Sequence, residues 1–379
     1  MPYRYFRLLI AFVFLCFSAS AQTNFKTKYN NSSIFTGIEV GSKGVKMSVV
    51  EIGKNAQSSG AFNILKDTSV NTDFISFTTA TFQATLDGLY SFYQTATKDY
   101  KIAPRKVFTV LSSGVKTQAA KDGKNEWIAN LIDSFRTRIR EPQRAVEVVD
   151  VYKEAYLSHL GIVPESRRYT TFLLDIGSGN TKGGFFPGNS LQKFYLFQLT
   201  WGTKTVANAA EKRVEGDKSL ANYKKQLTRV LVGAENDEII YAVNSSGVYP
   251  VSDNIAFSGG IAWATATLID PELIDNAVIT VSFEEVERFC TKLYENYEAL
   301  SSKFLASNIN SPTQREAVLK ETARVHKVFD QRSLMAGAGL LLKIMRQFAS
   351  VYETKQFYLV KNGQVGWISA YVEESIQSK

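Results

Sequence analysis

The chain has 379 residues, with 44 lysines and arginines against 36 aspartates and glutamates, so its formal net charge is +8. Hydrophobic residues make up 45% and charged residues 21%, ordinary values that exclude disordered, collagen-like and coiled-coil chains. Two histidines and two cysteines are too few for a three-histidine or four-cysteine zinc site, or for a disulfide framework. The length favours two domains and is also compatible with one large domain.

Residues 1–21 have the three parts of a secretory signal. Arg4 and Arg7 give a positive start, residues 8–17 form a short apolar run, and small residues precede a cleavage site after Ala21. The apolar run is much shorter than the roughly 20 residues that a membrane-spanning helix needs. We therefore expect an exported chain, periplasmic or secreted, with no membrane span after signal cleavage.

The first half of the mature chain alternates strands and helices. Residues 22–34 are polar and asparagine-rich, and we expect a flexible lead. Apolar residues at 35–41 and alternating residues at 44–52 flank a glycine-bounded turn and predict a β-hairpin. The following segments predict a strand at 62–65, a helix around 82–93, a strand at 106–111, a helix at 127–135, a strand at 146–149 and a helix at 152–160.

The same order of elements starts again near residue 171. A strand at 171–177 and its hairpin partner at 180–186 repeat the pattern of the first hairpin. One βββαβαβα unit is thus expected twice, which predicts an α/β chain with domains at 35–165 and 166–379. The remaining segments predict strands at 196–199, 255–258 and 357–360, and helices after Gly202 and at 281–293 and 334–348.

Two glycine-bounded turns carry the residues of chemical interest. Each follows a carboxylate, Glu39 or Asp175, at the end of a strand. The glycines let backbone N–H groups approach an anion closely, and facing carboxylates can hold a divalent cation. A tight hairpin with a capping acid is the simpler interpretation of either motif alone, whereas both together in a duplicated frame favour a function. The turns contribute Gly41, Ser42 and Lys43, and Gly177, Ser178, Gly179, Asn180, Thr181 and Lys182.

Segments in both halves resemble motifs of the exopolyphosphatase/guanosine pentaphosphate phosphatase family (Ppx/GppA), in the superfamily of actin, sugar kinases and chaperone ATPases. The resemblance implies two duplicated ribonuclease H-like (actin-like ATPase) domains with mixed sheets flanked by helices. The similar segments are residues 38–46 and 174–182, which resemble the two phosphate motifs, and residues 153–161, 199–203, 257–261 and 336–339.

The resemblance also implies a chemistry. Members of the family hydrolyse terminal phosphoanhydrides with the help of a divalent cation. By resemblance, Glu154 is the general base for the attacking water, and Glu39 and Asp175 hold Mg²⁺. The substrate implied is polyphosphate or another phosphoanhydride, lying against the glycine turns and against Gly259 and Gly260 of a later motif.

Three polar positions depart from the family pattern. Glu39 stands where the family has aspartate, and Lys116 stands where it has an arginine that faces phosphate. Lys182 stands where the family has a metal-associated glutamate, so the charge is reversed. This lysine either binds a phosphate oxygen in place of part of a metal's charge, or marks a site that binds phosphate without turnover.

Three functions stay open at this point. The chain is an exported phosphohydrolase, a phosphate- or polyphosphate-binding protein without turnover, or a scaffold for protein contacts. Arginines at 136, 138, 140 and 144 form a basic cluster. A solvated surface is the simpler interpretation of this cluster, and attraction of a polyanion is the functional one. No nucleic-acid-binding motif accompanies this cluster, so nucleic acid is not expected as a partner. The sequence leaves the oligomeric state open, a homodimer included.

Overall fold

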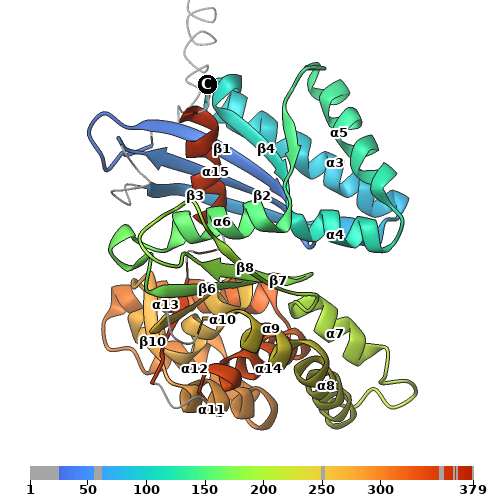
Figure 1. Ribbon diagram of the computed structural model, residues 1–379, viewed down its shortest axis with the longest axis vertical. Coiled ribbons are helices and arrows are strands. Elements are labelled where there is room, and N and C mark those ends of the chain that lie inside the picture. Colours follow the sequence, from blue (N-terminus) through green and yellow to red (C-terminus); the bar gives the residue numbers. More distant parts are fainter. Residues whose placement is uncertain are drawn as a thin grey trace, which may run out of the picture.

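The computed structural model describes residues 25–54, 62–248, 252–349, 354–361, 363 and 366–377. Two mixed β-sheets, each flanked by helices, form the molecule (Figure 1). This architecture confirms the α/β class with two mixed sheets that the sequence predicts. The proposed signal, residues 1–21, lies outside the described residues.

The first sheet has the strand order β3-β2-β1-β4-β5. Its three leading strands are antiparallel, and β4 and β5 add in parallel beside β1. The strands are β1 (Ser33–Val40), β2 (Gly44–Ile52), β3 (Phe62–Asn71), β4 (Val107–Leu111) and β5 (Val146–Val148). The α-helices of this half are α3 (Thr79–Gln94), α4 (Ser113–Lys121), α5 (Asn125–Ile139) and α6 (Val151–Ile162).

The second sheet has the order β10-β11-β9-β6-β7-β8. Its run β8-β7-β6-β9 repeats the run β3-β2-β1-β4 of the first sheet, with the same antiparallel meander followed by a parallel neighbour. The expected duplication is therefore present in the strand topology. The strands are β6 (Thr171–Ile176), β7 (Thr181–Phe185), β8 (Tyr195–Leu199), β9 (Asn254–Ser258), β10 (Val278–Val281) and β11 (Gln356–Val360).

Helices cover the second sheet and share one large hydrophobic core with it. The helix expected at 281–293 begins later, because Val281 ends β10 and Ser282 caps the helix by accepting from the backbone N–H of Glu285 at 3.1 Å. The helices are α7 (Thr203–Glu211), α8 (Leu220–Ala234), α9 (Ile240–Ser245), α10 (Gly260–Ile269), α11 (Phe283–Glu295), α12 (Ser302–Ser307), α13 (Pro312–Val328) and α14 (Gln331–Ala349).

The last helix, α15 (Gly366–Gln377), returns to the first sheet (Figure 1). It packs against α6 and β1, and its Trp367 and Ile368 belong to the same hydrophobic cluster as Phe35 and Leu157. The sequence division that assigns the whole of 166–379 to the second unit is therefore wrong for this helix. The apolar face of α15 packs against α6 and β1, and this tertiary packing decides the position of the helix.

The start of the described chain is tied to the first sheet. The backbone N–H groups of Lys28 and Tyr29 each donate to the carboxylate of Glu51 on β2 at 2.8 Å, and the hydroxyl of Ser32 donates to it at 2.6 Å. These bonds to a buried carboxylate anchor residues 28–32 to β2, and the flexibility expected for residues 22–34 stays a prediction. None of the helices within the described ranges combines the length and the apolar composition of a membrane span.

Candidate functional site

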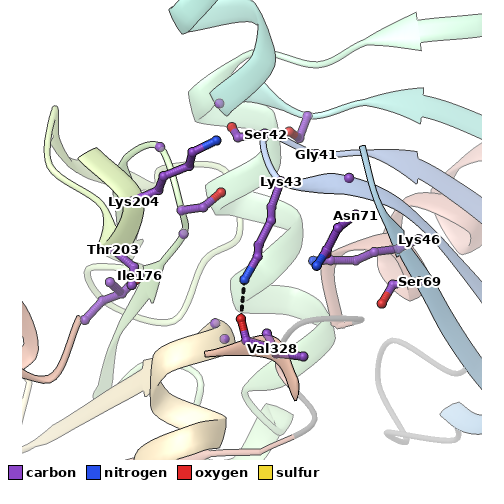
Figure 2. A pocket seen from close by; sticks show the side chains of 18 of the residues that line it. Gly41, Ser42, Lys43, Lys46, Ser69, Asn71, Ile176, Thr203, Lys204 and Val328 are labelled. Carbon is purple, nitrogen blue, oxygen red and sulfur yellow. Dashed lines mark hydrogen bonds between the residues drawn. The ribbon is translucent and has the colours of Figure 1, made fainter. Parts of the chain in front are cut away.

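A cavity of about 430 Å³ lies between the two sheets. Its walls come from the turns after β1 and β6, from α6, from the start of α7 and from the end of α13. Figure 2 shows this pocket, with Lys43 and Lys204 extending into it from opposite walls. The duplicated topology explains the position, because the equivalent turns of the two sheets meet here.

Close backbone contacts require glycine in these turns. The N–H of Gly41 donates to the carbonyl of Gly44 at 2.8 Å, and the N–H of Gly177 donates to the carbonyl of Asn180 at 2.9 Å. A Cβ atom built on Gly179 would lie 3.0 Å from Oγ of Ser42, so the two turns face each other closely. Gly259 adopts a φ of 95°, and a Cβ there would lie 2.3 Å from the carbonyl oxygen of Ile176.

Lys182 on β7 lies between two carboxylates. Its Nζ is 2.8 Å from Oδ2 of Asp175 on β6 and 2.9 Å from Oε1 of Glu154 on α6. The other oxygen of Glu154 accepts from the backbone N–H of Ser113 at 2.6 Å, so both oxygens of this carboxylate are engaged. Lys182 is 4% exposed and Glu154 is 2% exposed, so this ion-pair cluster is almost closed to water.

Burial alone would lower the pKa of Lys182, but the carboxylates of Asp175 and Glu154 outweigh it and hold that pKa above its usual value. The side chain is therefore an ammonium at neutral pH. A Cβ atom built on Gly177 would lie 3.8 Å from this Nζ, which places the charge at the edge of the second glycine turn.

The first hairpin repeats this pairing of an acid with a lysine. Glu39 on β1 faces Lys46 on β2 in the strand register, as Asp175 on β6 faces Lys182 on β7. Burial raises the pKa of Glu39, and the charge of Lys46 opposes that rise only in part. Glu39 in turn raises the pKa of Lys46. Each glycine turn is thus flanked by one carboxylate and one ammonium.

Three cations cross between the two halves at this cleft. Nζ of Lys43 donates to the carbonyl of Val328 at 2.6 Å (Figure 2). Lys204 pairs with Asp73, and Arg324 pairs with Asp67 at 3.3 Å. Sequence reasoning missed Lys46, Lys204 and Arg324, although the alternation of β2 around Lys46 and the position of Lys204 just after the Gly202 motif were available as signals.

Most of the residues expected at the site line the cavity. Lys116 does not: it lies on the exposed face of α4, because the helix turns Gly114 and Val115 inward and carries the next residue outward. The expectation that Lys116 faces phosphate is therefore wrong. Thr181 is also outside the lining, since its hydroxyl is buried and donates to the carbonyl of Trp201 at 2.8 Å. The expected residues in the lining are Glu39, Gly41, Ser42, Lys43, Glu154, Asp175, Gly177, Ser178, Gly179, Asn180, Lys182, Gly259 and Gly260.

The side chains do not fit the Mg²⁺ site that the resemblance implied. The ammonium of Lys182 lies within 3 Å of both Asp175 and Glu154, where a metal held by these carboxylates would sit. Glu39 faces a second lysine, Lys46. Within the described ranges, no group of three or more His, Cys, Asp and Glu side chains is placed to hold a metal ion.

Comparison with solved structures gives matches along most of the chain. A Ppx/GppA family member from Aquifex aeolicus matches with a TM-score of 0.58 and 18% identity, over 92% of this chain and 99% of its own. An exopolyphosphatase from Cytophaga hutchinsonii matches with a TM-score of 0.56 and 15% identity, over 90% of this chain and 98% of its own. An exopolyphosphatase-like protein matches with a TM-score of 0.57 and 13% identity, over 92% of this chain and 100% of its own.

At these identities the similarity shows the fold. It confirms the two-domain, actin-like architecture of Ppx/GppA proteins that the sequence motifs led us to expect. Neither the scan against family models nor the search of curated proteins found a match.

Proposed function

We propose that the chain binds polyphosphate or a related phosphoanhydride in this cleft and removes its terminal phosphate. The observation that carries the proposal is the meeting of two glycine turns in a cavity that is also lined by Lys43, Lys46, Lys182 and Lys204. Turns of glycine and small polar residues, together with clustered ammonium groups, are suited to a string of phosphates. The fold shared with exopolyphosphatases supports the same substrate class.

The residues of the site suggest how hydrolysis would proceed. A phosphate oxygen entering beside Gly177 would draw the ammonium of Lys182 away from Glu154, whose Oε1 could then accept a proton from water. The water oxygen bonds to the terminal phosphorus while the bridging P–O bond breaks. Orthophosphate and a chain shorter by one phosphate leave. The lysines stabilise charge on the non-bridging and leaving oxygens.

A second candidate is phosphate binding without turnover. One observation favours it: Lys182 and the N–H of Ser113 engage both oxygens of Glu154, the group that has to activate water. A base that stays locked in this arrangement would leave a binding protein. The two candidates share the ligand and differ only in whether Glu154 is released when phosphate binds.

Phosphate release and binding, measured in parallel, separate these candidates. Wild type is expected to release phosphate from polyphosphate, and Glu154→Gln to release it about a hundredfold more slowly or worse, with binding retained. Wild type that binds but releases nothing is the non-catalytic protein. Wild type that binds no polyphosphate at low salt contradicts the phosphoanhydride proposal altogether. Single-stranded DNA of equal charge serves as the control polyanion, since we propose no nucleic-acid partner.

We also propose that this reaction takes place outside the cytoplasm. The support is the pattern of residues 1–21, with Arg4, Arg7 and the small residues before Gln22. Expression of the full chain followed by N-terminal sequencing of the exported product tests this. A product that starts at Gln22 is expected, and a full-length product that stays in the cytoplasm contradicts export.

A further inference from the structure

The two hairpins at the cleft share a pairing that their strand registers fix. In each, the acid one residue before the end of the first strand faces a lysine on the second strand: Glu39 opposite Lys46, and Asp175 opposite Lys182. The same position in both halves of a duplicated fold carries the same charge pattern. A carboxylate pair that holds a metal has a different pattern, because it leaves a net negative charge for the metal to neutralise.

Lys182 has the position and the charge of a bound cation. Its Nζ bridges Asp175 on one element and Glu154 on another, at 2.8 and 2.9 Å. Its side chain is 5% exposed, so the ammonium is held by the protein and is not a surface charge that could swing into bulk water. A divalent cation between the same oxygens would meet this ammonium at contact distance, and the two charges would repel each other.

The charge balance of the site leads to the same conclusion. The charged side chains that line the cavity balance, so no net negative charge is left for Mg²⁺ to neutralise. The five acids are Glu39, Asp67, Asp73, Glu154 and Asp175, and the five bases are Lys43, Lys46, Lys182, Lys204 and Arg324. Lys204 and Arg324 are already paired with Asp73 and Asp67, whereas Lys43 donates to the backbone carbonyl of Val328. A free divalent cation therefore gains little here, whereas an anion can contact the Lys43 ammonium.

We propose that this site carries its own cation: the Lys182 ammonium, supported by Lys46, contacts the phosphate oxygens and makes ligand binding independent of a divalent metal. The proposal rests on the proposed function for the identity of the ligand. It concerns the same cleft but makes a separate claim, namely that Asp175 and Glu154 hold a lysine in place of a metal ion. Lys182 is then a phosphate-binding residue, and the two carboxylates position it.

The first test uses the metal alone and does not depend on any phosphate ligand. Thermal melting of wild type is measured in EDTA and across a range of MgCl₂ and MnCl₂ concentrations, with Asp175→Asn in parallel. We expect melting temperatures that do not change with metal concentration. A saturable, metal-induced rise in wild type that disappears in Asp175→Asn would place a metal at these carboxylates and overturn the proposal.

The second test measures polyphosphate binding by wild type in EDTA and in Mg²⁺. Binding in EDTA is expected to be at least as tight, because Mg²⁺ screens the charge of polyphosphate itself. Binding seen only with Mg²⁺ overturns the proposal. Absence of binding in both buffers removes the proposed function, while the melting experiment still decides the claim about the metal.

The third test replaces the lysine by a carboxylate, so that the site can hold a metal ion. Lys182→Glu places a third carboxylate beside Asp175 and Glu154, and we expect a melting temperature that now rises with Mg²⁺, and binding in EDTA that is roughly tenfold weaker or worse. Lys116→Glu is the matched control, with the same charge change on the exposed face of α4. A folded Lys182→Glu variant that does not respond to Mg²⁺ contradicts the idea that the lysine takes the place of a metal. If this variant fails to fold, the two wild-type measurements still decide the question.

Discussion

Lys182 and Asp175 face each other across neighbouring strands of one hairpin, and Nζ of the lysine lies 2.8 Å from Oδ2 of the aspartate. The same Nζ lies 2.9 Å from Oε1 of Glu154, which belongs to α6 and not to the hairpin. One buried ammonium thus joins the second glycine turn to the helix that carries the candidate base. The stability of this region and its response to ligands both depend on that ammonium.

Removal of the ammonium should destabilise the fold. In Lys182→Gln, the carboxylates of Asp175 and Glu154 face each other in a buried setting without their shared counter-ion. We expect the free energy of unfolding to fall by about 3–5 kcal/mol. Urea unfolding measures this, and Lys116→Gln on the exposed face of α4 should change it by less than about 0.5 kcal/mol. A loss of the same size in both variants would mean that the ion-pair cluster does not stabilise the fold.

Lys43, in the turn between β1 and β2, should contribute to ligand binding. Its Nζ donates to the carbonyl of Val328 at 2.6 Å and lies 4.8 Å from the ring centre of Phe329. A charged phosphate oxygen is a stronger acceptor than this neutral carbonyl, so a ligand can displace the contact. Lys43→Met should weaken polyphosphate binding roughly tenfold at low salt. Titration calorimetry across a salt series should show this difference shrinking as salt rises, because screening weakens exposed charge pairs.

The control for Lys43 is Lys327→Met, which removes an equal charge from an exposed position on α13 outside the lining of the cavity. Equal weakening in both variants would show that general charge attracts the ligand, without a specific contact from Lys43.

The backbone at Gly259 should tolerate no side chain. Its φ is 95°, and a Cβ would lie 2.3 Å from the carbonyl oxygen of Ile176 and 2.8 Å from Oδ1 of Asp175. We expect Gly259→Ala to lower stability by more than about 2 kcal/mol and to disturb binding at the second turn. Gly216→Ala is the control, because nothing lies within 4 Å of a Cβ there. Melting curves that coincide for Gly259→Ala and wild type would contradict this geometry.

His159 should make stability depend on pH. It is fully buried on α6, where its Nε2–H donates to the carbonyl of Thr171 at 3.0 Å. Burial lowers its pKa from 6.5 to about 4, and the charge of Arg168 adds to this effect. The unfolded chain therefore binds the proton more readily than the folded chain does. The stability contributed by neutral His159 is complete above pH 6.5 and is lost as pH falls toward 4, by roughly 3 kcal/mol in total.

Urea unfolding at several pH values measures this dependence. His159→Gln should flatten the decline between pH 6.5 and 4, because the titrating group is gone. His326→Gln, at the other histidine of the chain, should keep it. A wild-type profile that is flat across this interval would contradict a buried neutral histidine.

Local patterns in the sequence were sufficient for the hairpins and their turns. The apolar residues of β1, the alternation of polar and apolar residues in β2, and the glycines that follow β1 and β6 specify strands and tight turns from neighbouring residues alone. The duplication also follows from order along the chain. The outward direction of Lys116 was not evident from motif spacing, because it depends on how α4 is rotated against the core.

What the sequence determined by itself was therefore the set of elements, the two turns and the surplus of lysine near them. Tertiary structure alone decided that α15 returns to the first sheet, and that Lys182 meets Glu154 as well as Asp175. Asp175 is seven residues from Lys182 on the same hairpin, so strand register alone could have paired them. Glu154 lies on a helix in the other half, and only the packing of α6 between the sheets brings its charge to the lysine. Long-range packing thus placed the Lys182 ammonium between the carboxylates of Glu154 and Asp175.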